Sequence, residues 1–330
     1  MKTIRWGIIG CGDVTEIKSG PGLQKALHSA LVSVMRRNGA LAADYAKRHG
    51  VPKWTDDADS VINDPEVDIV YIATPPSSHL EYTLRVAAAK KPVYVEKPMA
   101  RNHEECRRMV EACRTAGVPL FVAFYRRGLP RFLKVKELID SGAIGTVRFV
   151  TVTQFQRPFA SLASGTALPW RLQPEISGGG LFIDLASHTL DILDFLLGPI
   201  ASAIGHASNQ AGLYAAEDIV SGSWQFASGA QGTGTWCFTA HAGCDQNRIV
   251  GDRGEIAFST FGGDPITLTT STGSESFPGE NPLHIQQPLI QTIVNELNGA
   301  GKCPSTGETA ARTNWVMDQL LQDYRAVLPQ

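Results

Sequence analysis

Short apolar segments alternate with amphipathic segments along the first 125 residues. Residues 68–73 are typical, because every side chain after Asp68 is apolar and such a strand would be buried on both faces of its sheet. Buried strands separated by helices predict an α/β domain with a doubly wound parallel sheet. The expected strands are Thr3–Ile9, Ala30–Met35, Asp68–Ala73, Pro92–Glu96 and Pro119–Phe124, and the expected helices are Asn38–His49, Ser77–Ala89 and Asn102–Ala116.

After residue 125 the strands follow one another through glycine-rich turns, which favours an antiparallel sheet. We therefore predict a second, α+β domain over 126–330 with a large open, mostly antiparallel sheet, joined to the first without a low-complexity linker. Its long apolar helix, Leu181–Leu197, should stop at Gly198-Pro199. The expected strands are Thr146–Phe155, Ala201–Ser208, Ile219–Phe226, Gly232–Phe238, Gln246–Val250, Glu255–Phe258 and Ile266–Thr270, and the other expected helices are Arg131–Ser141, Pro288–Leu297 and Gly307–Val327.

Composition narrows the classes of protein that remain. Hydrophobic residues make up 43% of the 330 residues, and a net charge of −2 argues against a nucleic-acid or anionic-membrane partner. No apolar run is long enough to span a membrane, and the first residues lead directly into a strand without a signal-peptide pattern. Six cysteines without a C-x-x-C pair indicate reduced side chains in a cytoplasmic protein that needs no metal.

The first strand ends in Gly10-Cys11-Gly12, followed by Asp13 and Val14 at the start of a helix. Glycines at such a turn allow the backbone to approach a pyrophosphate near a helix N-terminus. Thr15 occupies the third glycine position of the usual fingerprint, so an ordinary glycine turn is the alternative.

The second strand ends in Arg36-Arg37, where a NAD site usually carries a carboxylate that binds the ribose 2′-hydroxyl. Two guanidinium groups could instead bind a 2′-phosphate through several charge-assisted hydrogen bonds. We therefore favour NADP(H) as the cofactor, with NAD(H) as a possibility. The alternative is a pair of exposed surface arginines.

Two further segments carry candidate chemistry. Lys97 lies at the carboxyl end of the strand Pro92–Glu96, the edge at which open α/β sheets bind ligands, although a lysine there is often only a solvated charge. On the predicted helix, Asp184, His188 and Asp191 share one face at spacings of four and three residues. A histidine flanked by carboxylates suits acid–base chemistry, and the alternative is the solvated stripe of an amphipathic helix.

Five motifs in order make the chain resemble the Gfo/Idh/MocA oxidoreductase family, which includes glucose–fructose oxidoreductase and inositol dehydrogenase. The resemblance implies a Rossmann domain over 1–125 that binds NAD(P), and a domain over 126–330 that binds substrate and forms dimers or tetramers through its sheet. The motifs are Gly10-Cys11-Gly12, residues 73–79, Glu96-Lys97-Pro98, Trp170-Arg171, and the glycines 178–180 followed by Asp184 and His188.

Carried over by position, the resemblance makes Lys97 and His188 the catalytic pair, assisted by Asp184, with a Lys97–Pro98 peptide that is commonly cis. Tyr125-Arg126 stands where Asn-Arg is frequent in the family, and we expect Tyr125 to contact the substrate and Arg126 the cofactor. The remaining cofactor contacts implied are the glycine turn with Asp13 and Val14, Thr74, Pro75, Pro76, His79 and Glu96, with Trp170 and Arg171 near the nicotinamide.

The resulting hypothesis is a dehydrogenase or reductase that acts on a secondary alcohol or ketone of a sugar, cyclitol or related polyol. Two alternatives remain: a glycoside-cleaving enzyme of the same fold that oxidises its sugar transiently, and a regulatory protein that senses NAD(P) without chemistry. We expect loop residues around Gln156–Arg171 and Ala240–Asn247 to determine the substrate.

Overall fold

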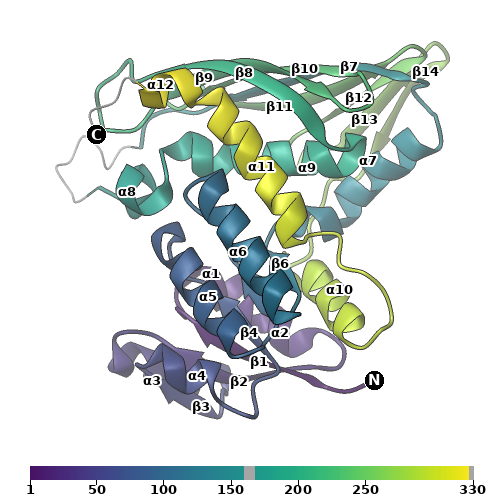
Figure 1. The fold of residues 1–330 in the computed structure, drawn as a ribbon. Helices are drawn as coiled ribbons and strands as arrows, with labels where there is room; N and C mark the ends of the chain where they lie inside the picture. Colours follow the sequence, from purple (N-terminus) through teal and green to yellow (C-terminus); the bar gives the residue numbers. More distant parts are fainter. Residues whose placement is uncertain (160–167, 327–330) are drawn as a thin grey trace. The chain divides into compact units, whose positions relative to one another are not determined.

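The computed structural model describes residues 1–159 and 168–326. The chain forms two compact units, one made of Met1–Leu129 with Pro282–Ala311 and the other of Pro130–Asn281 with the residues from Arg312 onward (Figure 1). Residues 282–311, which the sequence-based division assigns to the C-terminal domain, thus pack within the first unit. Part of the loop Gln156–Arg171, and the end of the last helix at Val327, lie outside the described residues.

The first unit contains a six-stranded sheet in the order β3-β2-β1-β4-β5-β6, and every pairing in it is parallel. This confirms the doubly wound α/β prediction. The strand order changes direction between β1 and β4, so the loops that follow these two strands meet at the switch point, where ligands bind in such sheets. The strands are β1 Ile4–Ile9, β2 Ser29–Met35, β3 Lys53–Thr55, β4 Ile69–Ile72, β5 Val93–Val95 and β6 Leu120–Val122.

The helices of this unit begin and end at ordinary signals. In α3, Gly39–His49, the Asn38 side chain accepts the Leu41 N–H at the start, and Gly50 ends the helix with a left-handed φ of 65°. The expected helix after the glycine turn is broken into two short helices. The helical segments are α1 Asp13–Ile17, α2 Gly20–Lys25, α3, α4 Ala58–Ile62, η1 Pro76–Ser78, α5 His79–Ala88, α6 His103–Ala116, η2 Tyr125–Gly128 and α10 Gln287–Leu297.

The second unit contains an eight-stranded sheet in the order β14-β13-β12-β11-β7-β10-β9-β8. Its pairings are antiparallel except for β10 with β7, which confirms the mostly antiparallel prediction. β14 was not predicted from the sequence. The strands are β7 Val147–Phe155, β8 Ile200–Ser208, β9 Ile219–Phe226, β10 Gln231–Cys237, β11 Cys244–Gly251, β12 Gly254–Phe258, β13 Ile266–Thr270 and β14 Gly273–Phe277.

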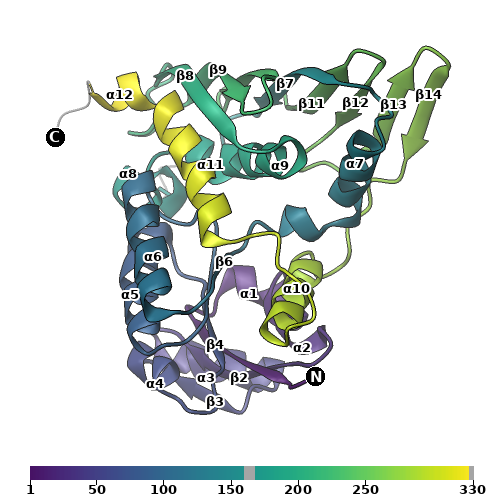
Figure 2. The same cartoon turned by 45° about the vertical axis from the view of Figure 1, so that its right-hand side comes forward.

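Helices α7 and α9 lie along one face of this sheet (Figure 2). Alternate residues of β10 face them, so Gly232, Gly234 and Trp236 are buried whereas Gln231 and Thr233 are exposed. None of the helices formed by residues 1–159 and 168–326 is long and apolar enough to cross a membrane. The helical segments of this unit are α7 Pro130–Asp140, η4 Trp170–Leu172, α8 Pro174–Ser177, η5 Phe182–Ala186, α9 Ser187–Leu197 and α12 Gln322–Ala326, with α11 Gly307–Leu320 crossing from the first unit into the second.

Gly20 provides a test of the packing behind the glycine turn. The Tyr45 hydroxyl donates a 2.9 Å hydrogen bond to the Thr15 carbonyl, and a β-carbon at Gly20 would overlap both oxygens. Because backbone must shift to relieve that overlap, we expect Gly20→Ala to lower the free energy of unfolding by about 2 kcal/mol. The control is Gly263→Ala, since a β-carbon there meets no atom within 4 Å. Equal stability of the two variants in urea titrations would contradict the prediction.

Candidate active site

The glycine turn after β1 leaves no room for a side chain at Gly10. Gly10 and Cys11 donate their N–H groups to the Met35 carbonyl at 2.8 and 3.0 Å, which ties the end of β1 to the end of β2. Gly10 has a φ of 91°, and a β-carbon on it would lie 2.7 Å from Thr74 Cγ2. The turn therefore packs against the loop that follows β4, and only glycine fits the closest position.

Thr15, at the position of the missing third glycine, forms hydrogen bonds that stabilise the turn. Its hydroxyl accepts the Gly12 N–H at 2.9 Å and donates to the Gly12 carbonyl at 2.8 Å. The N–H groups of Asp13 and Val14 lie in the first turn of α1, where helices leave N–H groups without intrahelical partners. This narrow turn fits a pyrophosphate approaching the backbone. With α1 only five residues long, those amides rather than a long helix dipole would attract it.

The two arginines at the end of β2 differ in their surroundings. Arg36 is half-buried and Arg37 is exposed, and neither forms an ion pair with a residue that the structure describes. Burial raises the pKa of the Cys11 thiol to about 11, and the positive charge of Arg36 opposes this rise. Arg36 is therefore close enough to the glycine turn to act on its electrostatics, whereas Arg37 resembles the surface arginine of the alternative interpretation.

The loop after β4 is supported from inside by His79. Its ring is completely buried, with Nε2 2.7 Å from the Thr74 carbonyl and Nδ1 3.1 Å from the Met99 carbonyl. Burial lowers the pKa of His79, which favours the neutral ring. The sequence-based expectation that His79 lines the cofactor does not fit this burial. The ring instead joins the Thr74 loop to the chain just after Pro98.

Lys97 follows β5 and is partly exposed at the carboxyl edge of the sheet, and its peptide bond to Pro98 is cis. Its backbone N–H donates to Glu96 Oε2 at 3.0 Å. The Glu96 carboxylate points into the unit, where Oε1 accepts from Tyr71 Oη at 2.6 Å and from Gln286 Nε2 at 2.7 Å. Glu96 was expected to contact the cofactor, whereas its buried carboxylate supports the turn that carries Lys97.

Gln286 had no signal in the sequence. It is fully buried, and its Oε1 accepts from Tyr94 Oη at 2.9 Å while its Nε2 donates to Glu96, so its amide binds both β5 and the residue that follows this strand. It lies 190 residues from Glu96 along the chain, in the segment that returns to the first unit. Only the folded arrangement reveals this contact.

In the second unit, the predicted helix 181–197 starts as a π-helix at Phe182–Ala186 and continues as α9. Asp184 and His188 are 8% and 4% exposed, and Asp191 is fully buried. Because these side chains are buried, the alternative interpretation of the helix face as a solvated stripe is excluded. A single π-turn inside a helix is frequently found at functional sites, and here it contains Asp184 and immediately precedes Ser187-His188.

Two acidic residues of this helix, Asp184 and Asp194, have different partners. Asp184 Oδ2 lies 3.2 Å from Arg171 Nε, and the Arg171 guanidinium stacks 4.4 Å from the centre of the Trp170 ring. Asp194 forms a two-pronged ion pair with Arg312 at 2.7 and 2.8 Å, which is a structural contact. The structure thus brings together three predicted site residues, namely Asp184, Arg171 and Trp170.

Tyr125 and Arg126 lie in η2 of the first unit. Both are buried, and the Arg126 guanidinium lies 5.0 Å from the centre of the Tyr125 ring.

Across residues 1–159 and 168–326, no group of three or more His, Cys, Asp or Glu side chains is placed to hold a metal ion.

Glu217 is a buried carboxylate that sequence reasoning missed. It is 2% exposed, and its Oε1 accepts the Gly180 N–H at 2.8 Å, at the start of the segment that leads to Asp184. A β-carbon on Gly179 or Gly180 would lie 3.2 or 3.3 Å from this carboxylate. The glycines of the triplet therefore let a buried acid reach the backbone in front of the candidate catalytic helix.

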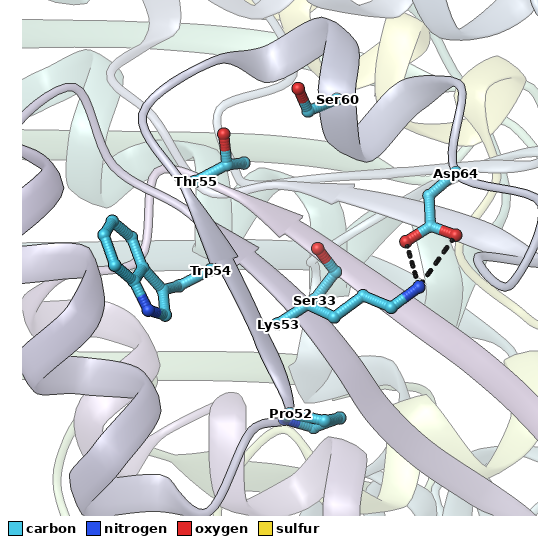
Figure 3. Close-up of a pocket in the computed structure, with 7 residues that line it drawn as sticks. All are labelled: Ser33, Pro52, Lys53, Trp54, Thr55, Ser60 and Asp64. Carbon is cyan, nitrogen blue, oxygen red and sulfur yellow. Dashed lines mark hydrogen bonds and ion pairs between the residues drawn. The ribbon is translucent and has the colours of Figure 1, made fainter.

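A surface pocket of about 380 Å³ lies at the β3 edge of the six-stranded sheet (Figure 3). Inside it, Lys53 forms an ion pair of 2.8 Å with Asp64. None of the predicted site residues lines this pocket. Its lining residues are Ser33, Pro52, Lys53, Trp54, Thr55, Ser60 and Asp64.

Comparisons with known proteins cover both units. Residues 4–124 match the model of an oxidoreductase family with an NAD-binding Rossmann fold, and residues 132–257 match the GFO/IDH/MocA C-terminal domain. The chain is 44% identical over 315 residues to Oxidoreductase P35 of Formosa agariphila, which covers 96% of this chain and 97% of that protein.

Relatives with named substrates are more distant. The scyllo-inositol 2-dehydrogenase (NAD(+)) of Bacillus subtilis is 31% identical, covering 83% of this chain and 78% of that protein. The 1,5-anhydro-D-fructose reductase of Ensifer adhaerens is 29% identical, covering 92% and 91%. Among solved structures, levoglucosan dehydrogenase in complex with NADH and levoglucosan has the same fold, with a TM-score of 0.86, 24% identity and coverage of 98% and 97%.

Glu217 predicts a specific dependence of stability on pH. Burial raises the pKa of its carboxyl from 4.5 to about 6, so the folded protein binds this proton more tightly than the unfolded chain. The stabilisation is complete below about pH 4.5 and is lost as the pH rises through about 6. We expect Glu217→Gln, which keeps the shape without the charge, to be more stable than the wild type by about 2 kcal/mol at pH 7 and equally stable at low pH. Urea unfolding at both pH values measures the difference, and a difference independent of pH would contradict the assignment.

Proposed function

Because the chain belongs to the Gfo/Idh/MocA oxidoreductase family, we propose that it transfers a hydride between a nicotinamide dinucleotide and a secondary alcohol or ketone of a sugar, cyclitol or related polyol. The observation that carries the proposal is the buried Asp184–His188 pair on one helix, in a chain that also presents Lys97 at the carboxyl edge of its Rossmann sheet. The named activities of the inositol dehydrogenase and the anhydrofructose reductase support this substrate class.

The chain's own residues would move the proton and stabilise charge. In the oxidative direction, neutral His188 accepts the proton of the substrate hydroxyl while the carbon–oxygen double bond forms. The Lys97 ammonium donates a hydrogen bond to the same oxygen and stabilises its alkoxide character. Asp184, held by Arg171, orients and tunes His188. When bound, the nicotinamide supplies the two-electron chemistry by taking the hydride from the substrate carbon.

The turn at Gly10 and Gly12, with the first amides of α1, would hold the pyrophosphate of this cofactor. Gly10 lets the turn pack closely against Thr74, and a β-carbon at Gly12 would meet no protein atom closer than 3.9 Å, so the backbone there is open to a ligand. We assign Thr74, Pro75 and Pro76 to the cofactor's edge, Arg126, Trp170 and Arg171 to its nicotinamide side, and Tyr125 to the substrate. Arg36 and Arg37 favour NADP(H) over NAD(H) through their charge. The inositol dehydrogenase is named for NAD(+), and the levoglucosan dehydrogenase was solved with NADH. The preference for NADP(H) is therefore proposed from Arg36 and Arg37 alone.

We further propose that residues 1–125 bind the cofactor, and that residues 126–330 bind substrate and form a homodimer or homotetramer. The exposed face of the eight-stranded sheet supports such an interface, because Ile204 is 64% exposed there beside Thr233 and Ser223. None of the six cysteines, all of which lie within residues 1–159 and 168–326, forms a disulfide bond, which supports a cytoplasmic location.

Replacement of the catalytic pair tests the mechanism. We expect Lys97→Ala and His188→Ala each to lower kcat by 10²-fold or more, on the order of the loss of an oxyanion donor or a general base. Cofactor binding should be kept, which calorimetric titration measures. The control is Lys47→Ala, an exposed lysine on α3. Wild-type turnover in both catalytic variants would refute the mechanism, and release of an aglycone without net formation of reduced cofactor would indicate transient oxidation instead.

The cofactor preference has its own test. In calorimetric titrations we expect tighter binding of NADP⁺ than of NAD⁺, and we expect the Arg36→Ala/Arg37→Ala variant to lose about tenfold or more of its NADP⁺ affinity, since a charge-assisted hydrogen bond contributes about 1.5–3 kcal/mol. Affinity for NAD⁺, which has no 2′-phosphate, should change little. If the wild type prefers NAD⁺, the two arginines do not meet the 2′ position.

A further inference from the structure

Phe261 lies against the proposed proton acceptor and had no signal in the sequence. It follows β12, and its ring centre lies 5.6 Å from that of His188 with the two planes at 84°, an edge-to-face arrangement. Phe261 is 36% exposed, whereas His188 is 4% exposed. An open aromatic surface therefore borders the buried imidazole within the second unit.

The loop that presents Phe261 is fixed by one carboxylate. Asp245 of β11 accepts three successive backbone N–H groups, from Thr260 at 2.9 Å, Phe261 at 2.6 Å and Gly262 at 3.1 Å. Hydrogen bonds to an ionised acceptor are stronger than neutral ones. Asp245 also lies in the segment 240–247 that the sequence analysis connected with substrate choice, and this contact gives the segment a route to the site.

Thr260 joins the same loop to the catalytic helix. Its hydroxyl lies 3.1 Å from the hydroxyl of Thr189, the residue after His188, and accepts from Asn247 Nδ2 at 2.9 Å. Both Thr189 and Asn247 are buried. The positions of the Phe261 and His188 rings are thus coupled through neighbouring residues on both sides.

Arg131 of α7 also stabilises the loop, through hydrogen bonds to its backbone carbonyls. Its guanidinium is buried and donates to the carbonyls of Ser259 at 3.1 Å, Asp264 at 3.2 Å and Gly279 at 3.1 Å, and also to that of Gly262. Several backbone oxygens around Phe261 therefore depend on one side chain. A loop held in this way keeps its aromatic ring in place before any ligand arrives, which lowers the entropy cost of binding.

We propose that Phe261 contacts the substrate and selects for cyclic substrates, an inference that rests on the proposed function. A pyranose, anhydrosugar or cyclitol ring has a patch of C–H groups that can pack on an aromatic ring, while its hydroxyls face polar partners. An open-chain polyol has no such rigid patch, and it must lose torsional freedom to form one. Phe261 thereby favours rings, and it also restricts rotation of the His188 imidazole.

The test compares steady-state kinetics of the wild type, Phe261→Leu and Phe261→Ala with NAD⁺ and NADP⁺. The probes are levoglucosan and myo-inositol as cyclic alcohols and D-mannitol as an open-chain polyol. We expect Phe261→Ala to raise KM for the cyclic alcohols about tenfold, because the apolar contact between the aromatic ring and the substrate ring is lost, with a smaller change in kcat. Phe261→Leu should recover part of the loss. The matched control is Leu133→Ala, a large apolar residue of the same unit that is 45% exposed.

An unchanged KM for the cyclic alcohols in Phe261→Ala, or an equal loss for D-mannitol, would overturn the inference. A second measurement needs no turnover: the imidazole signals of His188, assigned with His188→Gln in histidine-labelled protein, should move in Phe261→Leu because the ring current is lost. Unchanged signals would overturn the contact. Absence of turnover by the wild type with every probe and both cofactors would overturn the proposed function instead, and the NMR result would then decide the contact alone.

Discussion

A buried carboxylate organises the end of β5, where Lys97 enters the candidate site. Taking the charge of Glu96 out of water is costly, and three donors compensate: the Tyr71 hydroxyl, the Gln286 amide and the Lys97 backbone N–H. The donors come from a neighbouring strand, from a distant segment and from the turn itself. Lys97 is therefore positioned by groups that never need to touch a substrate, while its side chain is left for the carboxyl edge of the sheet.

In the second unit, charged side chains also bind backbone groups, with different consequences. Asp245 accepts three backbone N–H groups in the loop of Phe261, and Arg131 donates to carbonyls of the same region. Glu217 is 2% exposed and accepts the Gly180 N–H, and burial raises the pKa of its carboxyl to about 6. For Glu217, the cost of burying the charge outweighs the stabilisation that this hydrogen bond gives to the ionised form.

Sequence reasoning located the sheets and the catalytic candidates because both leave local signals. A continuous apolar run marked β4, a β-branched run ending in a glycine turn marked β1, and the spacing of Asp184 and His188 marked the buried helix. Local pattern did not reveal the π-turn, because periodicity does not distinguish one inserted residue. It also missed β3, which is three residues long with no buried residue.

Other features were beyond a linear pattern. Glu96 and His79 belong to recognisable motifs, yet the direction of their side chains depends on Gln286 and on the Met99 carbonyl, which approach through folding. Phe261 is one apolar residue in a glycine-rich loop, and only its contact with His188 in the folded protein indicates a role for it. Contacts between residues that are distant in the sequence cannot be predicted from a local pattern, because only folding brings the residues together.

The return of residues 282–311 to the first unit has a consequence for biosynthesis. Gln286 must reach Tyr94 and Glu96, and Gly22 packs against Ile290 and Gln287, after about 150 residues of the second unit have been made. On the ribosome, the amino-terminal unit therefore lacks the contacts with Gln286, Gln287 and Ile290 while the eight-stranded sheet is synthesised. Its final packing can form only after residues 282–311 have been synthesised, although its first 129 residues emerge first.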